Sequence, residues 1–132
     1  MKIKLTSIYV DDQDKALSFY TNVLGLTKKA DFGNAGFRWL TVVSAEDPNG
    51  TELQLAASDN PAGKAYQQAI YQQGQPALML FTDDIKGEAE RIKAKGGKLK
   101  MEPTDVTGST IAQIEDGCGN LVQITQLKWS GA

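Results

Sequence analysis

The stretch that decides the fold is Tyr9-Val-Asp-Asp-Gln-Asp-Lys-Ala-Leu-Ser-Phe-Tyr-Thr-Asn-Val-Leu-Gly25. It begins as the end of an apolar strand, turns at two acidic residues and continues with apolar side chains at helical spacing. A carboxylate at Asp11 or Asp12 can accept hydrogen bonds from the first helical turn, and Gly25 suits the position that ends a helix. The apolar positions are Ala16, Phe19, Tyr20, Val23 and Leu24. The stretch predicts a strand and then a helix over about residues 12–24, packed on a sheet.

The same order of features returns in the second half of the chain. Leu78-Met-Leu-Phe-Thr-Asp-Asp84 is followed by a helical pattern over 84–95, and Asp84 lies 72 positions after Asp12. Each half also ends with an Asp-x-x-Gly turn, at Asp47 and Asp116, before an alternating strand. Two copies of one strand–helix–strands unit are therefore predicted.

This repeat predicts an α+β fold of two tandem βαβββ modules. We place the modules at residues 1–57 and 76–128, with a connecting helix in 58–75. A chain of 132 residues is long enough for one domain over 1–132, in which the two modules share a core. Strands are expected at 3–10, 26–32, 37–44, 51–56, 76–82, 98–102, 109–115 and 120–127, with loops at 33–36 and around Pro103.

Composition narrows the classes of partner. The chain has 14 basic and 16 acidic residues, which argues against nucleic acid, because phosphate binding needs a basic face. No apolar run approaches the length of a membrane span, and the first residues read as a strand rather than a secretory leader. The one cysteine, Cys118, allows no internal disulfide, and no histidine is present to activate it. A cytoplasmic protein without membrane contact is expected.

The paired modules resemble the vicinal oxygen chelate superfamily, which includes glyoxalase I, extradiol dioxygenases, fosfomycin-resistance enzymes and bleomycin-resistance proteins. The likeness rests on Asp-Asp-x-x-x-Ala-x-x-Phe-Tyr-x-x-Val-Leu-Gly at 11–25, on the two Asp-x-x-Gly turns and on the module order, and it covers nearly the whole chain. It implies eight strands in two cupped mixed sheets, with helices on the convex side and a ligand pocket on the concave side. The fold hosts several chemistries, so the resemblance does not by itself assign a function.

Metal-dependent members of that superfamily place a histidine on the first strand of each module and a glutamate on the last strand. The equivalent positions here hold Leu5 and Ala77, and Gln54 and Gln123. Leucine and alanine have no donor atom, and amide oxygens are weak, neutral ligands for a transition ion. We therefore expect no metal and no other cofactor. Enzyme activity through another base, such as Glu52 in an apolar pocket, stays open.

Strand alternation predicts which side chains line the concave face. The predicted ligand-binding residues are Leu5, Ser7, Tyr9, Trp39, Glu52, Gln54, Met79, Phe81 and Gln123. Aromatic and apolar walls with a few amides are typical of a small-molecule pocket, whereas a closed core would have to satisfy both amides internally. The pattern does not decide whether Arg38 or Trp39 faces inward.

Three functions remain open at this point. The first is a small-molecule-binding protein of the bleomycin-resistance type, which holds an organic ligand without metal. The second is a glyoxalase-like lyase or another enzyme of the superfamily, and the third is a dimeric structural or regulatory module with a vestigial pocket. A homodimer is expected by analogy with the superfamily, and because Trp39 and Trp129 would be better covered by a partner.

Overall fold

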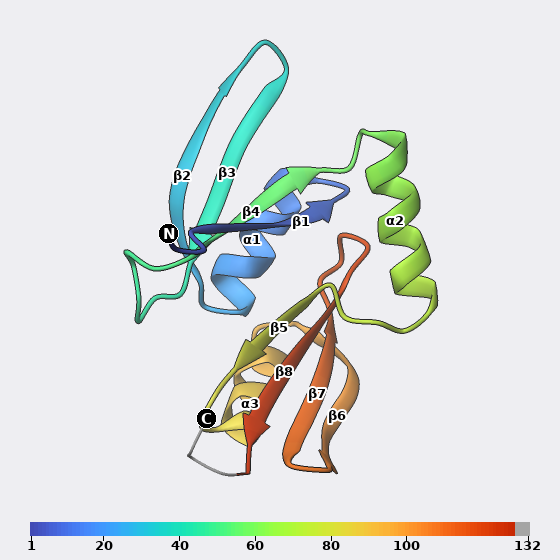
Figure 1. Cartoon of the computed structure of the whole chain (residues 1–132). Helices are drawn as coiled ribbons and strands as arrows, with labels where there is room; N and C mark the ends of the chain where they lie inside the picture. The colour runs from blue at the N-terminus through green and yellow to red at the C-terminus, as the bar shows by residue number, and fades with distance from the viewer. Residues whose placement is uncertain (129–132) are drawn as a thin grey trace.

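The computed structural model describes residues 1–128 and shows two four-stranded mixed sheets (Figure 1). The first sheet has the strand order β1-β4-β3-β2 and the second sheet the order β5-β8-β7-β6. In each sheet the first and last strands of the module pair in parallel, and the other neighbours are antiparallel. The strands are β1 Leu5–Val10, β2 Thr27–Asn34, β3 Phe37–Val43, β4 Glu52–Ala57, β5 Leu78–Phe81, β6 Lys98–Val106, β7 Ser109–Glu115 and β8 Leu121–Leu127. The predicted α+β fold of two βαβββ modules is confirmed.

Three helices connect these strands: α1 Gln13–Ser18, α2 Pro61–Gln72 and α3 Ile85–Ala94. A π-helical turn, Phe19–Val23, continues α1 close to the predicted end of that helix. The side chain of Asp12 caps α1 and that of Asp84 caps α3, each by accepting from the backbone N–H three residues further on. The two helix starts therefore follow from the short carboxylates that the repeat places there. No helix within residues 1–128 is long and apolar enough to cross a membrane.

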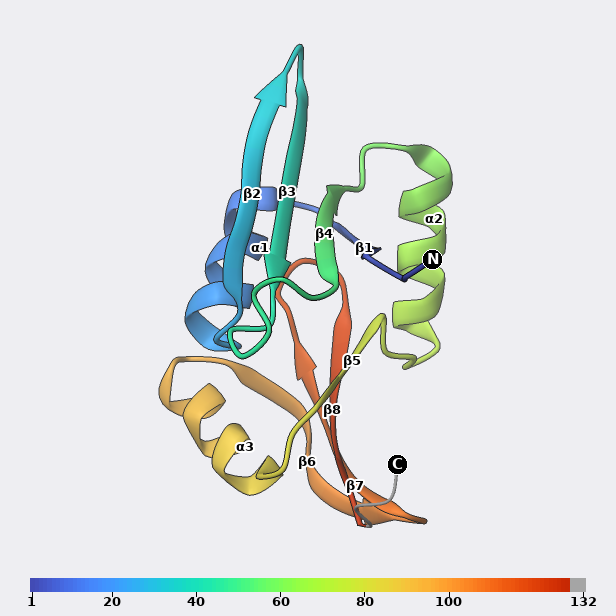
Figure 2. The same cartoon turned by 60° about the vertical axis from the view of Figure 1, so that its left-hand side comes forward.

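Helices α1 and α3 cover the same side of the two sheets (Figure 2). The side chains between helices and sheets form one core cluster drawn from both modules. Its fully buried members include Val10, Tyr20, Leu40, Leu55, Ile92, Ile114 and Val122. Complete burial of one aliphatic side chain of this size stabilises the fold by about 1.5–3 kcal/mol. We call the opposite side of each sheet its open face.

The connecting helix α2 lies differently, against the open-face side of the first sheet near the end of β1 (Figure 2). Asn60 caps it, and Pro61 occupies its first turn. A Cβ atom at Gly63 would come within 2.8 Å of the Tyr9 ring, so the helix can approach this ring only because Gly63 has no side chain. Helix α2 therefore covers part of the Tyr9 side chain, one of the predicted ligand-binding residues.

Strand β6 is longer than the sequence predicted. The expected loop around Pro103 is wrong, because β6 continues to Val106, with register shifts between Leu99 and Met101 and between Met101 and Thr104. Strand β6 lies at the edge of the second sheet, where a proline without an N–H and a bulged register are tolerated.

The first hairpin is also longer than predicted. Strand β2 extends to Asn34, and the turn consists only of Ala35 and Gly36, with φ of 54° and 83°. Two consecutive residues at positive φ are the signature of the two-residue turns that match strand twist. The glycine-containing loop expected at 33–36 is therefore half strand. Strands β1 and β5 start two residues later than predicted.

A buried polar cluster joins the two modules. The Tyr20 hydroxyl donates to Asp116 Oδ2 at 2.7 Å, which connects the first helix with the last turn of the chain. Asp116 also accepts from the backbone N–H groups of Cys118 and Asn120, at 2.7 and 3.0 Å, and from Asn120 Nδ2 at 2.8 Å. Burial, and then the nearby Asp116 charge, raise the pKa of the Tyr20 phenol well above its ordinary value. The phenol therefore remains a proton donor.

Helix α2 is tied into the same cluster. Gln67 Nε2 donates to the carbonyl oxygen of Tyr9 at 3.1 Å and to that of Cys118 at 2.7 Å. Asn120 Nδ2 donates to the same Tyr9 oxygen at 2.7 Å. The connecting helix, the first strand and the last turn are thus held together by side-chain amides.

Candidate functional site

The open face of the first sheet carries an ordered set of polar side chains. Ser7 and Thr41 lie on either side of Gln54, from neighbouring strands. The Ser7 hydroxyl donates to Gln54 Oε1 at 2.7 Å, and the Thr41 hydroxyl donates to Glu52 Oε1 at 2.7 Å. Within residues 1–128 the Gln54 amide nitrogen and the second oxygen of Glu52 have no side-chain or backbone partner. This face therefore holds one donor and one acceptor ready for another molecule.

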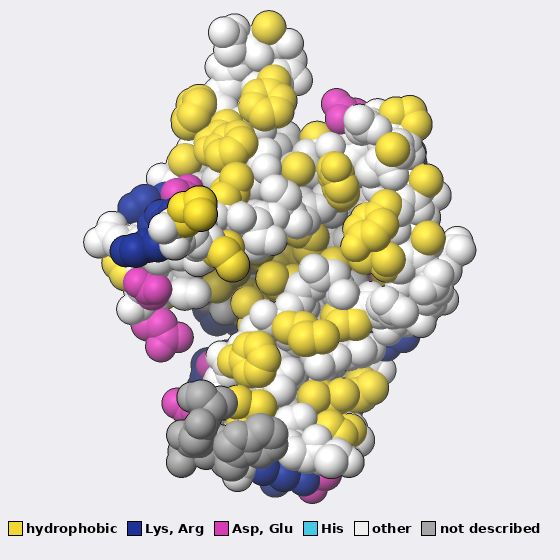
Figure 3. All heavy atoms as spheres, viewed as in Figure 1, with side chains coloured by type: hydrophobic (Ala, Val, Ile, Leu, Met, Phe, Trp, Pro, Cys, Tyr) yellow, Lys and Arg dark blue, Asp and Glu magenta, His cyan; other side chains and the backbone are white. Residues whose placement is uncertain are grey.

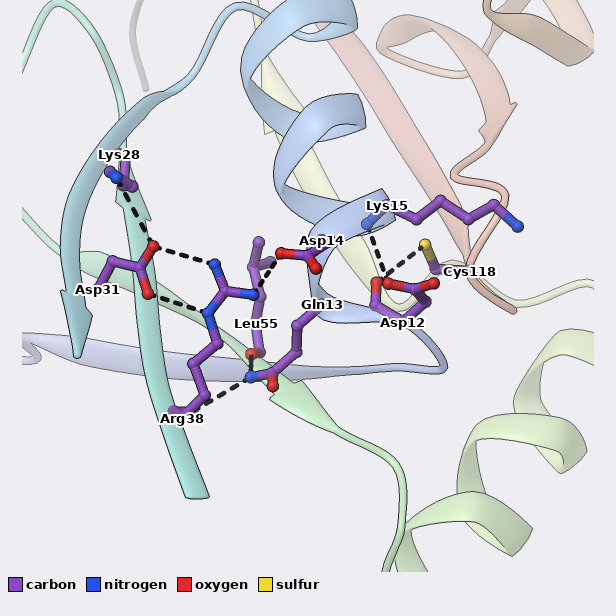
Figure 4. Close-up of polar contacts among 9 residues, drawn as sticks. All are labelled: Asp12, Gln13, Asp14, Lys15, Lys28, Asp31, Arg38, Leu55 and Cys118. Atoms are coloured by element: carbon purple, nitrogen blue, oxygen red, sulfur yellow. Dashed lines mark hydrogen bonds and ion pairs between the residues drawn. The ribbon is translucent and has the colours of Figure 1, made fainter. Parts of the chain in front are cut away.

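The structure decides the orientation of strand β3. Arg38 donates to Asp14 of α1 at 2.6 Å and to both carboxylate oxygens of Asp31 at 2.9 and 3.0 Å, so it lies on the helix-covered side (Figure 4). Gln13 Nε2 fixes the same end of α1 by donating to the carbonyl oxygens of Arg38 and Leu55. Hydrogen bonding to the Arg38 guanidinium lowers the pKa of the Asp31 carboxyl. Since neighbouring side chains alternate, Trp39 belongs to the open face.

The open face of the second sheet is more apolar and more loosely connected. Met79 pairs with Gln123 and Phe81 with Thr125 across β5 and β8, and the two apolar side chains are 53% and 61% exposed. Gln113 Nε2 donates to Gln123 Oε1 at 3.5 Å, and Gln123 Nε2 donates to Thr125 Oγ1 at 3.4 Å. These distances are at the upper limit for hydrogen bonds. The amide of Gln123 is therefore weakly held.

A small cavity lies between the two modules, and residues from both sides of the sheets line it. Glu52 of the first sheet and Met79 of the second line the same cavity of about 230 Å³. Phe81 contributes to a larger cavity of about 970 Å³ between the two modules. The other predicted ligand-binding residues line neither cavity: Leu5, Ser7, Tyr9, Trp39, Gln54 and Gln123. Most of the predicted site in a single chain is thus an open surface, and hydrophobic side chains gather over both sheets on this side (Figure 3).

Thr41 is the functional candidate that the sequence did not reveal. It is fully buried, and its hydroxyl orients the Glu52 carboxylate. The pattern of strand 37–44 contains apolar residues on both faces, so alternation alone did not show which side Thr41 occupies. Its register opposite Gln54 supplies that information.

The residues at the four superfamily metal positions do not fit a transition ion. Leu5 and Ala77 offer no donor atom, and the side-chain oxygens of Gln54 and Gln123 already accept from Ser7 and Gln113. Across residues 1–128 no three His, Cys, Asp or Glu side chains are grouped so that they could hold a metal ion. The chemistry of the open faces is therefore that of amides, hydroxyls, aromatic rings and one carboxylate.

Comparison with known sequences places the chain among proteins of this architecture. Residues 2–124 match the Glyoxalase/Bleomycin resistance protein/Dioxygenase superfamily. The Uncharacterized protein YurT of Bacillus subtilis (strain 168) is 50% identical over 126 residues, which cover 96% of this chain and 99% of that protein. A Probable lactoylglutathione lyase of Vibrio cholerae serotype O1 is 27% identical over 139 residues, which cover 99% and 94% of the two chains.

Among solved structures, the chain is similar to TnmS3, an antibiotic binding protein from Streptomyces sp. CB03234. The two share 26% sequence identity and superpose with a TM-score of 0.77 over 97% of each chain. The arrangement of sheets and helices described above is therefore that of a known group of proteins.

Proposed function

The chain belongs to the glyoxalase/bleomycin resistance protein/dioxygenase superfamily, and from that premise we propose that it is a small-molecule-binding protein that uses no metal. The ligand is an organic molecule that lies against the open faces of the sheets. The proposal rests on two polar groups of the first sheet that have no hydrogen-bond partner within residues 1–128: the Gln54 amide nitrogen and one Glu52 oxygen. The hydroxyls of Ser7 and Thr41 hold these two side chains in place. The antibiotic-binding description of TnmS3 supports the same class of function.

The exposure of the open faces supports ligand binding over a closed core. Leu5, Met79 and Phe81 are 41%, 53% and 61% exposed, although all three are large apolar side chains. Large apolar side chains that gather on one exposed side of a protein often mark a site of ligand or protein binding. A flat apolar molecule on these side chains, oriented by Gln54 and Gln123, would remove that surface from water.

A ligand screen by thermal shift tests the proposal. A molecule that binds only the folded chain raises the melting temperature of the protein. The stabilisation grows with the logarithm of the ratio of ligand concentration to Kd. A broad panel of planar and partly apolar compounds that leaves the melting temperature unchanged would favour the alternative of a dimeric module with a vestigial pocket. The lyase alternative rests on the names of relatives such as the Vibrio cholerae protein, and the metal positions described above do not support a metal-dependent version of it.

Replacing Gln54 by leucine is the sharpest single test of the proposed site. With a compound from the screen, we expect affinity to fall by about 1–2 kcal/mol, the usual contribution of one hydrogen bond. The melting temperature should stay the same or rise slightly, because Ser7 is exposed and can donate to water instead. Calorimetric titration and thermal unfolding of the same variant measure both quantities.

The matched control is Asn22→Leu, which removes an exposed amide from the π-helical turn after α1, on the helix-covered side of the sheet. It should leave affinity unchanged. If Gln54→Leu lowers the melting temperature and leaves affinity as it was, Gln54 is a structural residue and the ligand lies elsewhere.

A second copy of the chain is the partner that we propose for the apolar open faces. Trp39, one of the two aromatic residues that suggested a dimer, is half-buried, and Trp129 lies outside the described residues. The more exposed aromatic side chains are Phe32, Phe37 and Phe81 on the sheets and Tyr66 on α2. The position of the three phenylalanines on or beside the open faces supports a symmetric contact at these side chains, beside the polar groups proposed for the ligand.

Phe81→Asp should therefore weaken dimerisation at least about tenfold, because a charge replaces an aromatic side chain in an apolar contact. Sedimentation velocity should show the wild-type chain of 14.3 kDa as a dimer at micromolar concentration and the variant shifted toward monomer. Tyr66→Asp, which lies on α2 rather than on a sheet and is as exposed as Phe81, is the control and should remain dimeric. A monomeric wild-type protein would contradict the dimer.

A further inference from the structure

The cavity of about 230 Å³ between the two sheets contains one charged group. Within residues 1–128 its lining is apolar, from residues such as Val43, Leu78 and Leu80, with the hydroxyls of Thr6, Ser44 and Thr51 and the carboxylate of Glu52. No lysine or arginine of the described chain contributes to this lining. The electrostatic character of the cavity is therefore set by Glu52.

The Glu52 carboxylate is oriented but not neutralised. The hydroxyl of the fully buried Thr41 donates to Oε1 at 2.7 Å, which fixes the side chain and leaves the other oxygen unengaged. No ion pair within residues 1–128 includes Glu52. Arg38 lies on the opposite side of the sheet, where Asp14 and Asp31 already engage it. A carboxylate oxygen that no side chain or backbone group of residues 1–128 engages is available to a ligand that carries a positive charge.

We propose that the ligand carries a cationic amine, and that Glu52 binds this amine in the cavity while the apolar body of the ligand lies along the open face past Met79. This inference rests on the proposed function and names its ligand class. The cavity is smaller than the 300–1,000 Å³ typical of a site that encloses a whole drug-sized molecule, so part of such a ligand would lie outside it. An ammonium donates several hydrogen bonds, and those to a carboxylate are about twice as strong as neutral ones.

The test uses three probes with the same aromatic body: naphthylmethylamine, naphthylmethanol and naphthoate, which are cationic, neutral and anionic at neutral pH. Calorimetric titration of the wild-type protein should give the amine at least about tenfold higher affinity than the alcohol. The carboxylate probe should bind more weakly than either. In Glu52→Gln the affinity for the amine should fall to that of the alcohol, and the affinity for the alcohol should not change.

Two further variants separate a local contact from general charge effects. Glu90→Gln removes an exposed carboxylate from α3 that lines neither cavity, so it alters the net charge equally and should keep the preference for the amine. Thr41→Val keeps the side-chain volume and removes the hydroxyl that orients Glu52, and should reduce the preference about threefold. In a Glu52→Gln background Thr41→Val should have no effect on the preference, which identifies Thr41 as a positioning residue.

The outcomes distinguish this inference from the proposed function. If the amine and the alcohol bind the wild-type protein equally, or if Glu52→Gln keeps the preference, ligand binding stands and the assignment of an amine is wrong. If no probe binds the wild-type protein, the proposed function fails for this class of molecule and the assignment of an amine fails with it.

Discussion

Replacing Asp116 by alanine is expected to lower the free energy of unfolding by about 4 kcal/mol. The substitution leaves three buried donors without an acceptor: the Tyr20 hydroxyl and the N–H groups of Cys118 and Asn120. It also removes one of the acceptors of the Asn120 amide, which keeps its bond to the Tyr9 carbonyl oxygen. Each unsatisfied buried polar group costs about 1–3 kcal/mol, and relaxation of the turn recovers part of the sum. Urea unfolding measures the change, with the slope of the transition as a check that the compactness of the two states is unaltered.

The pseudo-equivalent aspartate of the first module provides a matched control. Asp47 opens the corresponding Asp-x-x-Gly turn but is exposed, so Asp47→Ala should cost less than about 1 kcal/mol. Tyr20→Phe removes only the hydrogen bond from the Tyr20 hydroxyl to Asp116 and should cost about 1–2 kcal/mol. If Asp116→Ala and Asp47→Ala destabilise the protein equally, the buried cluster is not what holds the modules together.

The thiol of Cys118 is expected to react with iodoacetamide about a thousandfold more slowly in the folded protein than in the chain unfolded by urea. Burial first, and then the nearby Asp116 charge, raise the pKa of the Cys118 thiol from 9.0 to about 12. Because the thiolate is the nucleophile, its fraction at mildly alkaline pH falls about a thousandfold with this change. The side chain is also fully buried, so the reagent cannot reach it without local opening. Alkylation followed by mass spectrometry gives both rates, and a folded-state rate within tenfold of the unfolded one would contradict the prediction.

The same pKa difference predicts how stability depends on alkaline pH. The unfolded chain releases the thiol proton near pH 9, whereas the folded chain retains it until about pH 12. The unfolded state therefore binds fewer protons in that window, and stability should fall as pH rises through it, with the contribution intact below pH 9. Cys118→Ala should reduce this part of the alkaline decline, which urea unfolding at a series of pH values would measure.

Much of the fold could be predicted because its signals are local and occur twice. The carboxylates of Asp12 and Asp84 each cap a helix by accepting from a backbone N–H only three residues further on. The spacing of 72 residues between these two aspartates indicates two copies of one module. The apolar period of each segment then defines strands and helices, and the module order specifies which strands share a sheet. The sequence also shows that the chain has no histidine. It shows which residues stand at the four superfamily metal positions: Leu5, Gln54, Ala77 and Gln123.

The details of the candidate site depended on partners that are distant in the chain. The sequence places Arg38 and Trp39 side by side, and only the contacts of Arg38 with Asp14 and Asp31 assign Trp39 to the open face. Thr41 became a candidate through its register opposite Gln54 and its hydrogen bond to Glu52. Strand alternation says which residues share a face but not which face meets the helix, and that choice is made by packing.

The relation between the modules was likewise decided by tertiary structure. Asp116 and Asp47 occupy the same position of the repeat, yet one is buried against Tyr20 and the other is exposed. Two similar modules follow from the sequence alone, because caps, periodicity and turn residues act within a few positions of the chain. The contact of the turn at Asp116 with Tyr20, and the cavity that Glu52 and Met79 share, follow from the folded chain, because burial depends on which distant residues lie near.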